Sequence, residues 1–308
     1  MALLTKDEPA KVVRLIRRGA DQDDAPEVEV GLPTAATARA PAPAQRGMDL
    51  AGSPCVFLIG PGKVGKSTFA RWAGGRMTEA GREAFLAALD GGARTLTVYF
   101  EGAEQPTVAD PAAPAKRIPT RDPVHVTAFL RDALEHVMSA RPPTMLDMGG
   151  NDNALPSLLG ATQGLLATLE EAGVAPVALY FLGPRVSDLD ALAVLEARGF
   201  QPKATALVLN AGVVDATMDP TDAFAAMRRH SVFRSAVGRG ALVLEMPKLP
   251  PDLAAEIERK QLHFADARDG LVPPGKAVAP VGGLNRAAVR RWMTDMESAF
   301  APIAHWLP

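Results

Sequence analysis

The feature that most constrains this chain is the run GPGKVGKS at residues 60–67, which fits the pattern G-x-x-x-x-G-K-S. An apolar stretch at residues 55–59 precedes it, and a helix-forming stretch follows it. Gly60, Gly62 and Gly65 allow backbone angles and close approaches that a Cβ atom would obstruct. The sequence therefore predicts a strand, a phosphate-binding loop and a helix, in that order.

The residues of this loop have distinct predicted roles. Successive backbone N–H groups and the N-terminus of the following helix face a polyphosphate. The Lys66 ammonium group reaches the β- and γ-phosphate oxygens, and the Ser67 hydroxyl is a ligand of Mg²⁺. An accidental match to the pattern is expected in roughly one per cent of chains of this length. We therefore predict nucleotide binding by Gly60, Gly62, Lys63, Val64, Gly65, Lys66, Ser67 and Thr68.

Short apolar runs alternate with stretches of helical periodicity in the rest of the chain. Strands are predicted at residues 55–59, 84–89, 144–146, 176–182, 204–209 and 241–245. Helices are predicted at residues 66–80, 124–139, 155–172, 189–198, 221–230, 252–261 and 285–301. This alternation favours the α/β class, with a mostly parallel sheet covered by helices on both faces.

The N-terminal part of the chain differs in composition from the rest. Residues 21–45 are rich in Pro, Ala and acidic side chains and have little apolar surface to bury, so they cannot offset the entropy cost of ordering. We predict a disordered N-terminal arm at residues 1–47 and one P-loop NTPase domain with C-terminal helices at residues 48–308. The alternative for the arm is a partner-binding segment around residues 12–18.

Overall charge and cysteine content limit the class of protein. The 33 Lys and Arg residues and 35 Asp and Glu residues give a net charge of −2, without the basic excess typical of nucleic-acid or membrane surfaces. The single cysteine, Cys55, favours a reducing compartment. The first ten residues lack the apolar core of a signal peptide, and no apolar run approaches a bilayer span. We expect a cytoplasmic protein without a membrane span.

Two acidic residues at predicted strand ends are candidates for catalysis. Asp147 begins the run DMGG and would hold Mg²⁺ through water, while the Gly150 amide would meet the γ-phosphate. Asp90 ends the strand after the loop helix and could orient the attacking water or the magnesium shell. The alternative for both residues is an ordinary strand-ending Asp before a glycine turn.

Asn210 ends another predicted strand and could hydrogen-bond the nucleotide base. The alternative is a turn residue, because Asn-Ala-Gly is typical of a strand exit. The N-K-x-D pattern that selects guanine is missing at this position. The sequence therefore favours ATP, with Mg²⁺, over GTP.

With residues 60–68, Asp90, residues 147–150 and Asn210 in this order, the chain resembles the ParA/MinD/CobQ-like ATPases. Within that group it is similar to the plasmid-transfer TraL/StbB-type nucleotide-binding proteins, from about Pro54 to the C-terminal helix. The resemblance implies a SIMIBI-like P-loop NTPase and strengthens the catalytic assignment of Lys66, Asp90 and Asp147. It also implies a nucleotide-dependent protein, often a homodimer, with a protein partner in plasmid or DNA partition or transfer.

The chain departs from this family at one position of the loop. These ATPases carry a second lysine just before the paired glycines, which reaches the phosphates of the partner subunit, and Pro61 stands there in this chain. Lys63 either takes that role or is a solvated loop lysine. The sequence thus leaves open whether a nucleotide-sandwich dimer forms.

Three functions fit these residues. The first is a slow, Mg-dependent ATPase that works as a nucleotide-controlled switch. The second is a phosphotransferase for a small molecule or cell-wall precursor, for which only the stretch from Arg94 through Arg117 to Arg121 could supply an arginine-bearing lid. The third is a module that binds nucleotide without turnover. A basic cluster at residues 228–239 could contact DNA or an acidic partner, or be a solvated face.

Overall fold

The computed structural model describes residues 46–90, 96–150, 153–215 and 217–308. The chain divides into two units, residues 1–43 and 44–308, and the described residues belong to the second. Up to residue 45, the predicted disordered arm lies outside the described residues. Arg94 and residues 151–152 also lie outside them.

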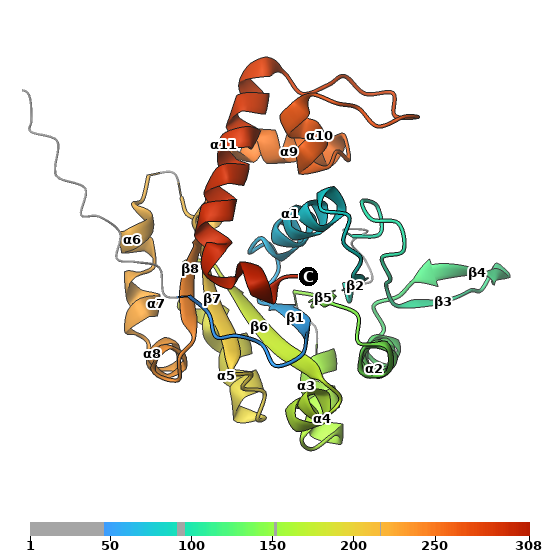
Figure 1. Ribbon diagram of the computed structural model, residues 1–308, viewed down its shortest axis with the longest axis vertical. Coiled ribbons are helices and arrows are strands. Elements are labelled where there is room, and N and C mark those ends of the chain that lie inside the picture. The colour runs from blue at the N-terminus through green and yellow to red at the C-terminus, as the bar shows by residue number, and fades with distance from the viewer. Residues whose placement is uncertain (1–45, 91–95, 151–152, 216) are drawn as a thin grey trace, which may run out of the picture. The chain divides into compact units, whose positions relative to one another are not determined.

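A six-stranded sheet forms the centre of the described unit (Figure 1). Its strand order is β2-β5-β1-β6-β7-β8, and every neighbouring pair is parallel. The strands are β1 (Ser53–Ile59), β2 (Phe85–Ala88), β5 (Thr144–Asp147), β6 (Val174–Leu182), β7 (Ala204–Asn210) and β8 (Leu242–Met246). The predicted α/β class with a mostly parallel sheet is confirmed.

Both faces of the sheet are buried. In β1, the side chains of Val56 and Leu58 belong to one core cluster, whereas those of Phe57 and Ile59 belong to the other. Successive strand residues point to opposite faces, so each strand contributes to both clusters. A strand buried on both faces reads as a continuous apolar run, which explains why all six strands were recognisable in the sequence.

Helices cover both faces (Figure 1). One face packs against α1 (Lys66–Glu79), α9 (Pro251–Arg259), α10 (Phe264–Asp269), α11 (Gly283–Phe300) and the 3-10 turn η3 (Ala301–Trp306). The other packs against α2 (Pro123–Ala140), α3 (Ala154–Ala161), α4 (Leu165–Glu171), α5 (Asp190–Ala197), α6 (Pro220–Ala223), α7 (Ala225–Arg229) and α8 (Ser231–Gly238). Two 3-10 turns, η1 (Val186–Leu189) and η2 (Ala211–Val213), follow β6 and β7.

Two predicted helices are each divided in the structure. The helix predicted at residues 155–172 is interrupted before Gly164, which has a left-handed backbone (φ 74°) and starts α4. The helix predicted at residues 221–230 is likewise divided between α6 and α7. The left-handed Gly164 cannot continue an α-helix, and Phe224, between α6 and α7, has φ −95° and ψ 2°, which departs from α-helical geometry. The predicted helical residues were therefore right, whereas the predicted continuity of each helix was wrong.

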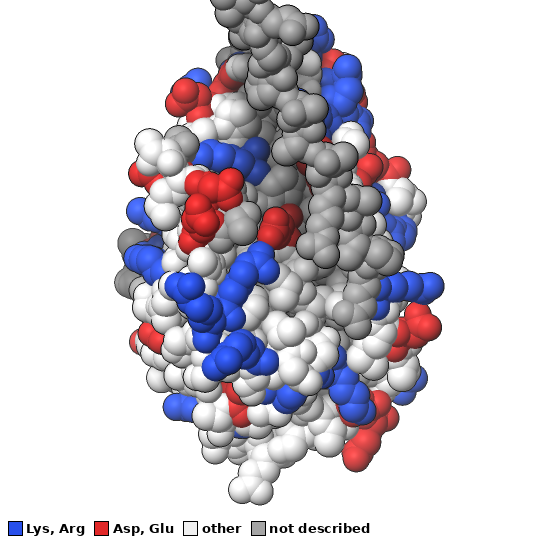
Figure 2. Space-filling model, turned by 90° about the vertical axis from the view of Figure 1, so that its left-hand side faces the viewer, with Lys and Arg blue, Asp and Glu red and all other residues white. Residues whose placement is uncertain are grey.

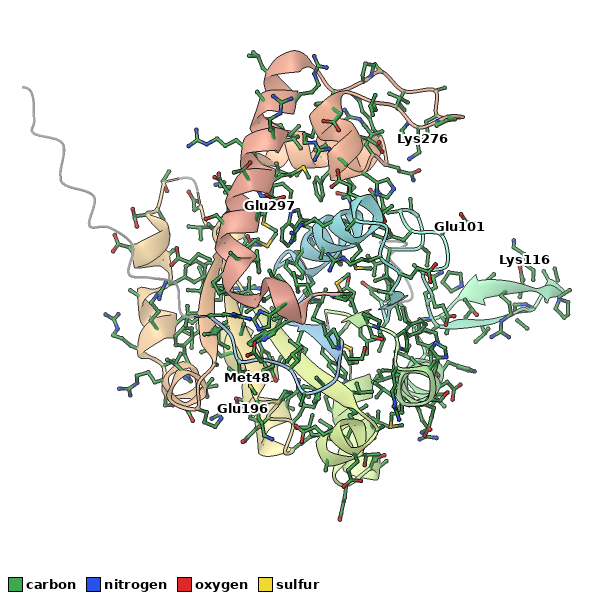
Figure 3. All side chains as sticks on the ribbon, viewed as in Figure 1. Met48, Glu101, Lys116, Glu196, Lys276 and Glu297 are labelled. Carbon is green, nitrogen blue, oxygen red and sulfur yellow. The ribbon has the colours of Figure 1, made fainter. Side chains whose placement is uncertain are left out.

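A β-hairpin that the sequence analysis did not predict lies between β2 and α2. It consists of β3 (Thr107–Asp110) and the exposed β4 (Ala113–Pro119), paired antiparallel. Lys116 on this hairpin points away from the rest of the domain (Figure 3). After the hairpin, Asp122 accepts hydrogen bonds from the backbone N–H groups of Val124 and His125 and thereby caps α2.

The first described residues are attached to the C-terminal turn. The Gly47 N–H donates to the Pro302 carbonyl (2.8 Å), and Trp306 Nε1 donates to the Met48 carbonyl (2.8 Å). Gly47, which the sequence analysis assigned to the N-terminal arm, therefore packs with the described domain. On β1, the Cys55 side chain is fully buried, and desolvation raises the pKa of its thiol. No helix among the described residues is long and apolar enough to cross a membrane.

Candidate nucleotide-binding site

The loop between β1 and α1 lies at the carboxyl edge of the sheet. Strand β1 is flanked by β5 on one side and β6 on the other, so chain segments leave its end in opposite directions across the sheet. Crevices form at such points in open α/β sheets, and ligands bind there. The loop runs from Gly60 to Gly65, and α1 begins at Lys66.

The Lys66 side chain folds back over the loop. Its Nζ atom donates hydrogen bonds to the carbonyls of Gly60 (2.7 Å) and Pro61 (2.8 Å), and only 6% of the residue is exposed. Burial lowers the pKa of Lys66, and the nearby carboxylates of Asp147 and Asp90 oppose that shift. Lys66 is thus held above the loop backbone, where the sequence places a phosphate-binding cation.

Ser67 and Asp147 are brought together by the pairing of β1 with β5. Ser67 Oγ donates a hydrogen bond of 2.8 Å to Asp147 Oδ2. A hydroxyl has one donor and two acceptor lone pairs, so this bond leaves the lone pairs of Ser67 for a metal ion. A hydroxyl and a carboxylate are hard oxygen donors of the kind that Mg²⁺ prefers. The two predicted metal-binding residues therefore fit Mg²⁺.

The Asp147 carboxyl group is buried, with 3% of the residue exposed. Desolvation raises the pKa of Asp147 to about 6, against the opposing effects of Lys66 and of the hydrogen bond from Ser67; Asp90 adds to the increase. A pKa this high means that the charge state of Asp147 changes within the range of common assay buffers. Strongly shifted pKa values of this origin are typical of functional sites.

Two glycines of the loop are required by its conformation. Gly65 has φ 96°, and a Cβ atom on it would lie 2.4 Å from the side-chain nitrogen of Asn210. Gly60 has φ 143°, and a Cβ atom there would lie 2.3 Å from the Phe181 carbonyl oxygen. Gly62 differs, because a Cβ atom on it would meet nothing within 4 Å. The sequence pattern identified all three glycines without showing this difference.

The loop after β5 contacts the phosphate-binding loop directly. A Cβ atom on Gly150 would lie 2.5 Å from both the Cα and the backbone nitrogen of Gly62. Only a glycine allows this approach. Gly150 was predicted to meet the γ-phosphate, which stays a prediction, and the structure places Gly150 beside Gly62, whose own Cβ position is open.

The Asn210 side chain is buried and bonded on both sides within the protein. Its Nδ2 atom donates to the Val64 carbonyl (2.8 Å), and its Oδ1 atom accepts from the Gly212 N–H (2.8 Å). Asn210 thus connects the end of β7 to the phosphate-binding loop, a positioning contact absent from the sequence analysis. A base contact by Asn210 stays a prediction.

Asp90 lies at the end of β2 and is paired with Arg121, which follows the hairpin. Arg121 Nη2 lies 3.4 Å from Asp90 Oδ1. The Arg121 side chain is 69% exposed and the Asp90 side chain is 40% exposed, so the pair adds little to stability. Of the three arginines considered in the sequence, Arg121 is brought to this edge of the sheet, whereas Arg117 bonds the Thr107 carbonyl on the hairpin.

Of the cavities that border the phosphate-binding loop in the described part of the chain, one is lined by Lys66 and another by Asp90. The first, of about 290 Å³, contains Lys63, Lys66, Ser67 and Thr68 together with Asn210 and an apolar wall that the sequence analysis missed: Val213, Met246, Pro247, Leu249 and Trp292. Trp292 Nε1 donates to the Pro247 carbonyl (3.0 Å), which fixes this wall against α11. No motif marks these apolar residues, because they come from the segment after β7, from the end of β8 and the segment after it, and from α11. An apolar wall of this kind suits a nucleotide base.

The second cavity, of about 360 Å³, lies on the other side of the loop. It is lined by Gly62, Gly149 and Gly150, by Asp90, Arg121 and Asn153, and by the apolar side chains of Leu89, Pro123 and Val126. If the base occupies the first cavity, the end of the phosphate chain points toward the second. We name them the base cavity and the γ-side cavity.

The basic cluster of residues 228–239 is partly neutralised. Arg228 pairs with Glu245 (2.6 Å), and Arg239 pairs with Glu196. Figure 2, which views the molecule from the side of α6 to α8, shows Lys and Arg side chains interspersed with Asp and Glu on this face. Arg229 and Arg234 are exposed. This arrangement is compatible with a solvated face as well as with an anionic partner.

Comparisons with known proteins give fold likeness alone. No protein-family model and no curated protein matches the sequence. Similar solved structures include chloroplast FtsY from Physcomitrella patens, 14% identical, with a TM-score of 0.37 over 80% of this chain and 67% of that chain. MinD cell division protein from Aquifex aeolicus is 16% identical, with a TM-score of 0.37 over 79% and 97%. FtsY from Mycoplasma mycoides is 11% identical, with a TM-score of 0.32 over 83% and 71%.

Proposed function

We propose that this protein is a Mg-dependent nucleotide-binding protein and a slow ATPase that acts as a nucleotide-controlled switch. The observation that carries the proposal is the hydrogen bond between Ser67 and Asp147 beneath the loop over which Lys66 is folded. Loop amides, the Lys66 ammonium group and the two hard oxygen ligands of Ser67 and Asp147 thus lie together at one edge of the sheet. Phosphoryl transfer depends mainly on such positioning and charge stabilisation.

The residues divide the chemistry among them. The Lys66 ammonium group stabilises negative charge that develops on the β- and γ-phosphates. Ser67 and Asp147 would hold Mg²⁺, which when bound neutralises further phosphate charge. Asp147 or Asp90 positions the attacking water, whose oxygen bonds to the γ-phosphorus as the bond to the β–γ bridging oxygen breaks.

The contact between Gly150 and Gly62 supports the switch. A γ-phosphate at the open side of Gly62 would bear on Gly150, whose loop continues toward α3. Nucleotide state would therefore change the position of Gly150, and a partner would detect that change. A homodimer, and a role with a protein partner in plasmid or DNA partition or transfer, follow from the sequence resemblance and belong to this proposal.

The nucleotide is proposed to be ATP. The base cavity offers an apolar wall but no Asp in the N-K-x-D arrangement, and the Asn210 amide is engaged by the protein. Recognition of adenine in such a cavity would rest on stacking and backbone contacts.

Titration calorimetry with Mg-ATP and Mg-GTP tests nucleotide binding. The wild type should bind at least one of them, and Lys66→Ala should weaken its affinity by tenfold or more. Lys116→Ala is the matched control, because this lysine is exposed on the hairpin and is expected to leave affinity unchanged. The proposal fails if neither nucleotide binds, or if Lys66→Ala binds as well as the wild type.

The γ-side cavity favours a second candidate, a phosphotransferase for a small molecule. An acceptor hydroxyl in this cavity would attack the γ-phosphorus, ADP would leave, and Asp90 would take the hydroxyl proton. A switch consumes ATP slowly without any acceptor, whereas a phosphotransferase consumes it only when one is supplied. Retention of unhydrolysed nucleotide in both assays would indicate a binding module.

A further inference from the structure

We propose that the γ-side cavity binds a small organic anion that also carries a hydrogen-bond donor, with Arg121 holding the anionic group and Asp90 accepting from the donor. The inference deepens the second candidate function and rests on it for the chemistry, although not for the binding. Nothing in the sequence pattern of the phosphate-binding loop requires this cavity.

The size and lining of the cavity indicate a small-molecule site. Its volume of about 360 Å³ lies within the range of roughly 300–1,000 Å³ typical of ligand pockets. Leu89 and Val126 are almost fully buried and form an apolar wall that would contact a carbon skeleton. A few polar groups against such a wall are what fixes the orientation of a small ligand.

Arg121 is suited to bind the anionic group. Its guanidinium carries five N–H donors in a planar fork that matches a carboxylate or a phosphate. Within the described parts of the chain, Arg121 forms an ion pair of 3.4 Å with Asp90 through one nitrogen atom, Nη2. With 69% of the side chain exposed, Arg121 can turn its remaining donors toward a ligand without losing packing.

Because of Asp90, a ligand of this cavity needs a hydrogen-bond donor as well as an anionic group. A simple anion would be repelled by this carboxylate, so Arg121 alone would provide a poor anion site. A molecule that bears a hydroxyl or ammonium group besides its anionic group satisfies both residues at once. The predicted class therefore includes hydroxy acids, amino acids and phosphate monoesters of polyols, and excludes plain carboxylates.

The position of the cavity connects such a ligand to the nucleotide. Gly62 belongs both to the phosphate-binding loop and to the cavity wall, and Gly150 lies against it. A ligand held by Arg121 and Asp90 would thus lie next to the end of the phosphate chain, where a hydroxyl acceptor must be for in-line transfer.

Calorimetric titration of L-malate, L-glutamate and glycerol 3-phosphate into the full chain tests the inference, both without nucleotide and with a Mg-bound non-hydrolysable ATP analogue. At least one of the three should bind the wild type with a Kd at or below about 1 mM. Arg121→Ala should weaken that binding by tenfold or more. Arg117→Ala should bind as the wild type does, because Arg117 lies on the hairpin outside the cavity.

Two further comparisons test whether binding depends on the hydrogen-bond donor of the ligand and on the guanidinium group of Arg121. Succinate, which lacks the hydroxyl of malate, should bind at least fivefold more weakly than malate if malate is a ligand, since succinate offers no hydrogen-bond donor to Asp90. Arg121→Lys should bind between the wild type and Arg121→Ala. The inference is overturned if none of the three compounds binds at about 10 mM, or if Arg121→Ala binds the ligand unchanged. Anion binding without any nucleotide binding would refute the proposed function and leave the cavity assignment standing.

Discussion

Ser67 Oγ lies 2.8 Å from Asp147 Oδ2 and thereby joins the start of α1 to the end of β5 across 80 residues of sequence. The bond aligns the hydroxyl so that its lone pairs face away from the carboxylate that would share a metal ion with it. Desolvation of Asp147 makes this arrangement sensitive to protonation. The first two predictions follow from this pair.

Asp147→Asn should abolish Mg-dependent nucleotide binding while leaving the fold intact. The amide keeps an oxygen that can accept from Ser67, but it removes the negative charge required to bind Mg²⁺. Because the carboxylate is costly to ionise in its buried position, the variant should be as stable as the wild type at pH 7.5, or more stable by up to about 3 kcal/mol. Urea unfolding measures the stability, and calorimetry with and without Mg²⁺ measures the binding. A large loss of stability would contradict this account.

Mg-nucleotide affinity should rise with pH through about 6, the pKa of Asp147. A raised pKa means that the contribution of this carboxyl to folding stability is complete below its unfolded pKa near 4 and is lost as the pH rises through about 6. Metal binding has the opposite dependence, because it needs the ionised form. Affinity should therefore increase about tenfold or more from pH 5 to pH 7.5. Nucleotide phosphates also titrate in this range, so the pH dependence of nucleotide affinity of the wild type without Mg²⁺ is the control.

Gly65→Ala should destabilise the protein by about 1–3 kcal/mol, because Gly65 has a left-handed backbone and its Cβ would collide with Asn210. Gly62→Ala should change the free energy of unfolding by less than about 0.5 kcal/mol, since a Cβ atom there meets nothing. Denaturant unfolding of the two variants without ligand measures this difference. Equal stabilities would show that the loop adapts to a side chain at either position.

Asn210→Ala should cost about 1–3 kcal/mol of stability, because it leaves the Val64 carbonyl without its hydrogen-bond donor in a buried position. It should also weaken nucleotide binding, since the loop then loses its connection to β7. Asn210→Asp is the sharper variant: a carboxylate retains the bond from the Gly212 N–H but repels the Val64 carbonyl. If Asn210→Ala lowers affinity at unchanged stability, a direct contact with the base would be the better explanation.

Gly150→Ala should reduce the preference for a nucleoside triphosphate over a diphosphate. The added Cβ would lie 2.5 Å from Gly62 and push residue 150 away from Gly62, where a γ-phosphate is expected. Affinity for ADP should change less than threefold, whereas affinity for a non-hydrolysable ATP analogue should fall by tenfold or more. Parallel loss of both affinities would mean that Gly150 supports the loop without sensing the γ-phosphate.

The strands of the sheet were predictable because each one is a short apolar run that can be recognised in the sequence by itself. All six strands were predicted within two residues of their observed bounds, since strands buried on both faces leave an unbroken apolar signal. The hairpin of β3 and β4 leaves no such signal, because most of its side chains are exposed and supply no alternation. The short helices α8 and α10 were missed for a related reason: few turns give little periodicity.

Only those site residues that belong to the phosphate-binding sequence pattern could be predicted with their roles. The loop glycines, Lys66 and Ser67 follow from the requirements of phosphate binding. By contrast, the pairing of Arg121 with Asp90 and the contact of Gly150 with Gly62 depend on strand order, which places segments distant in sequence at one edge. The hydrogen bond from Asn210 to Val64 likewise depends on the position of β7 near the loop, which the sequence does not specify.

The burial of Cys55 within β1 has a practical consequence. A thiol without solvent contact and with a raised pKa reacts slowly with maleimides and other electrophiles. The natural chain therefore needs no cysteine removal before site-directed labelling. A single cysteine introduced on the exposed hairpin (Figure 3), for example by Lys116→Cys, would carry a fluorophore at one defined position on the surface.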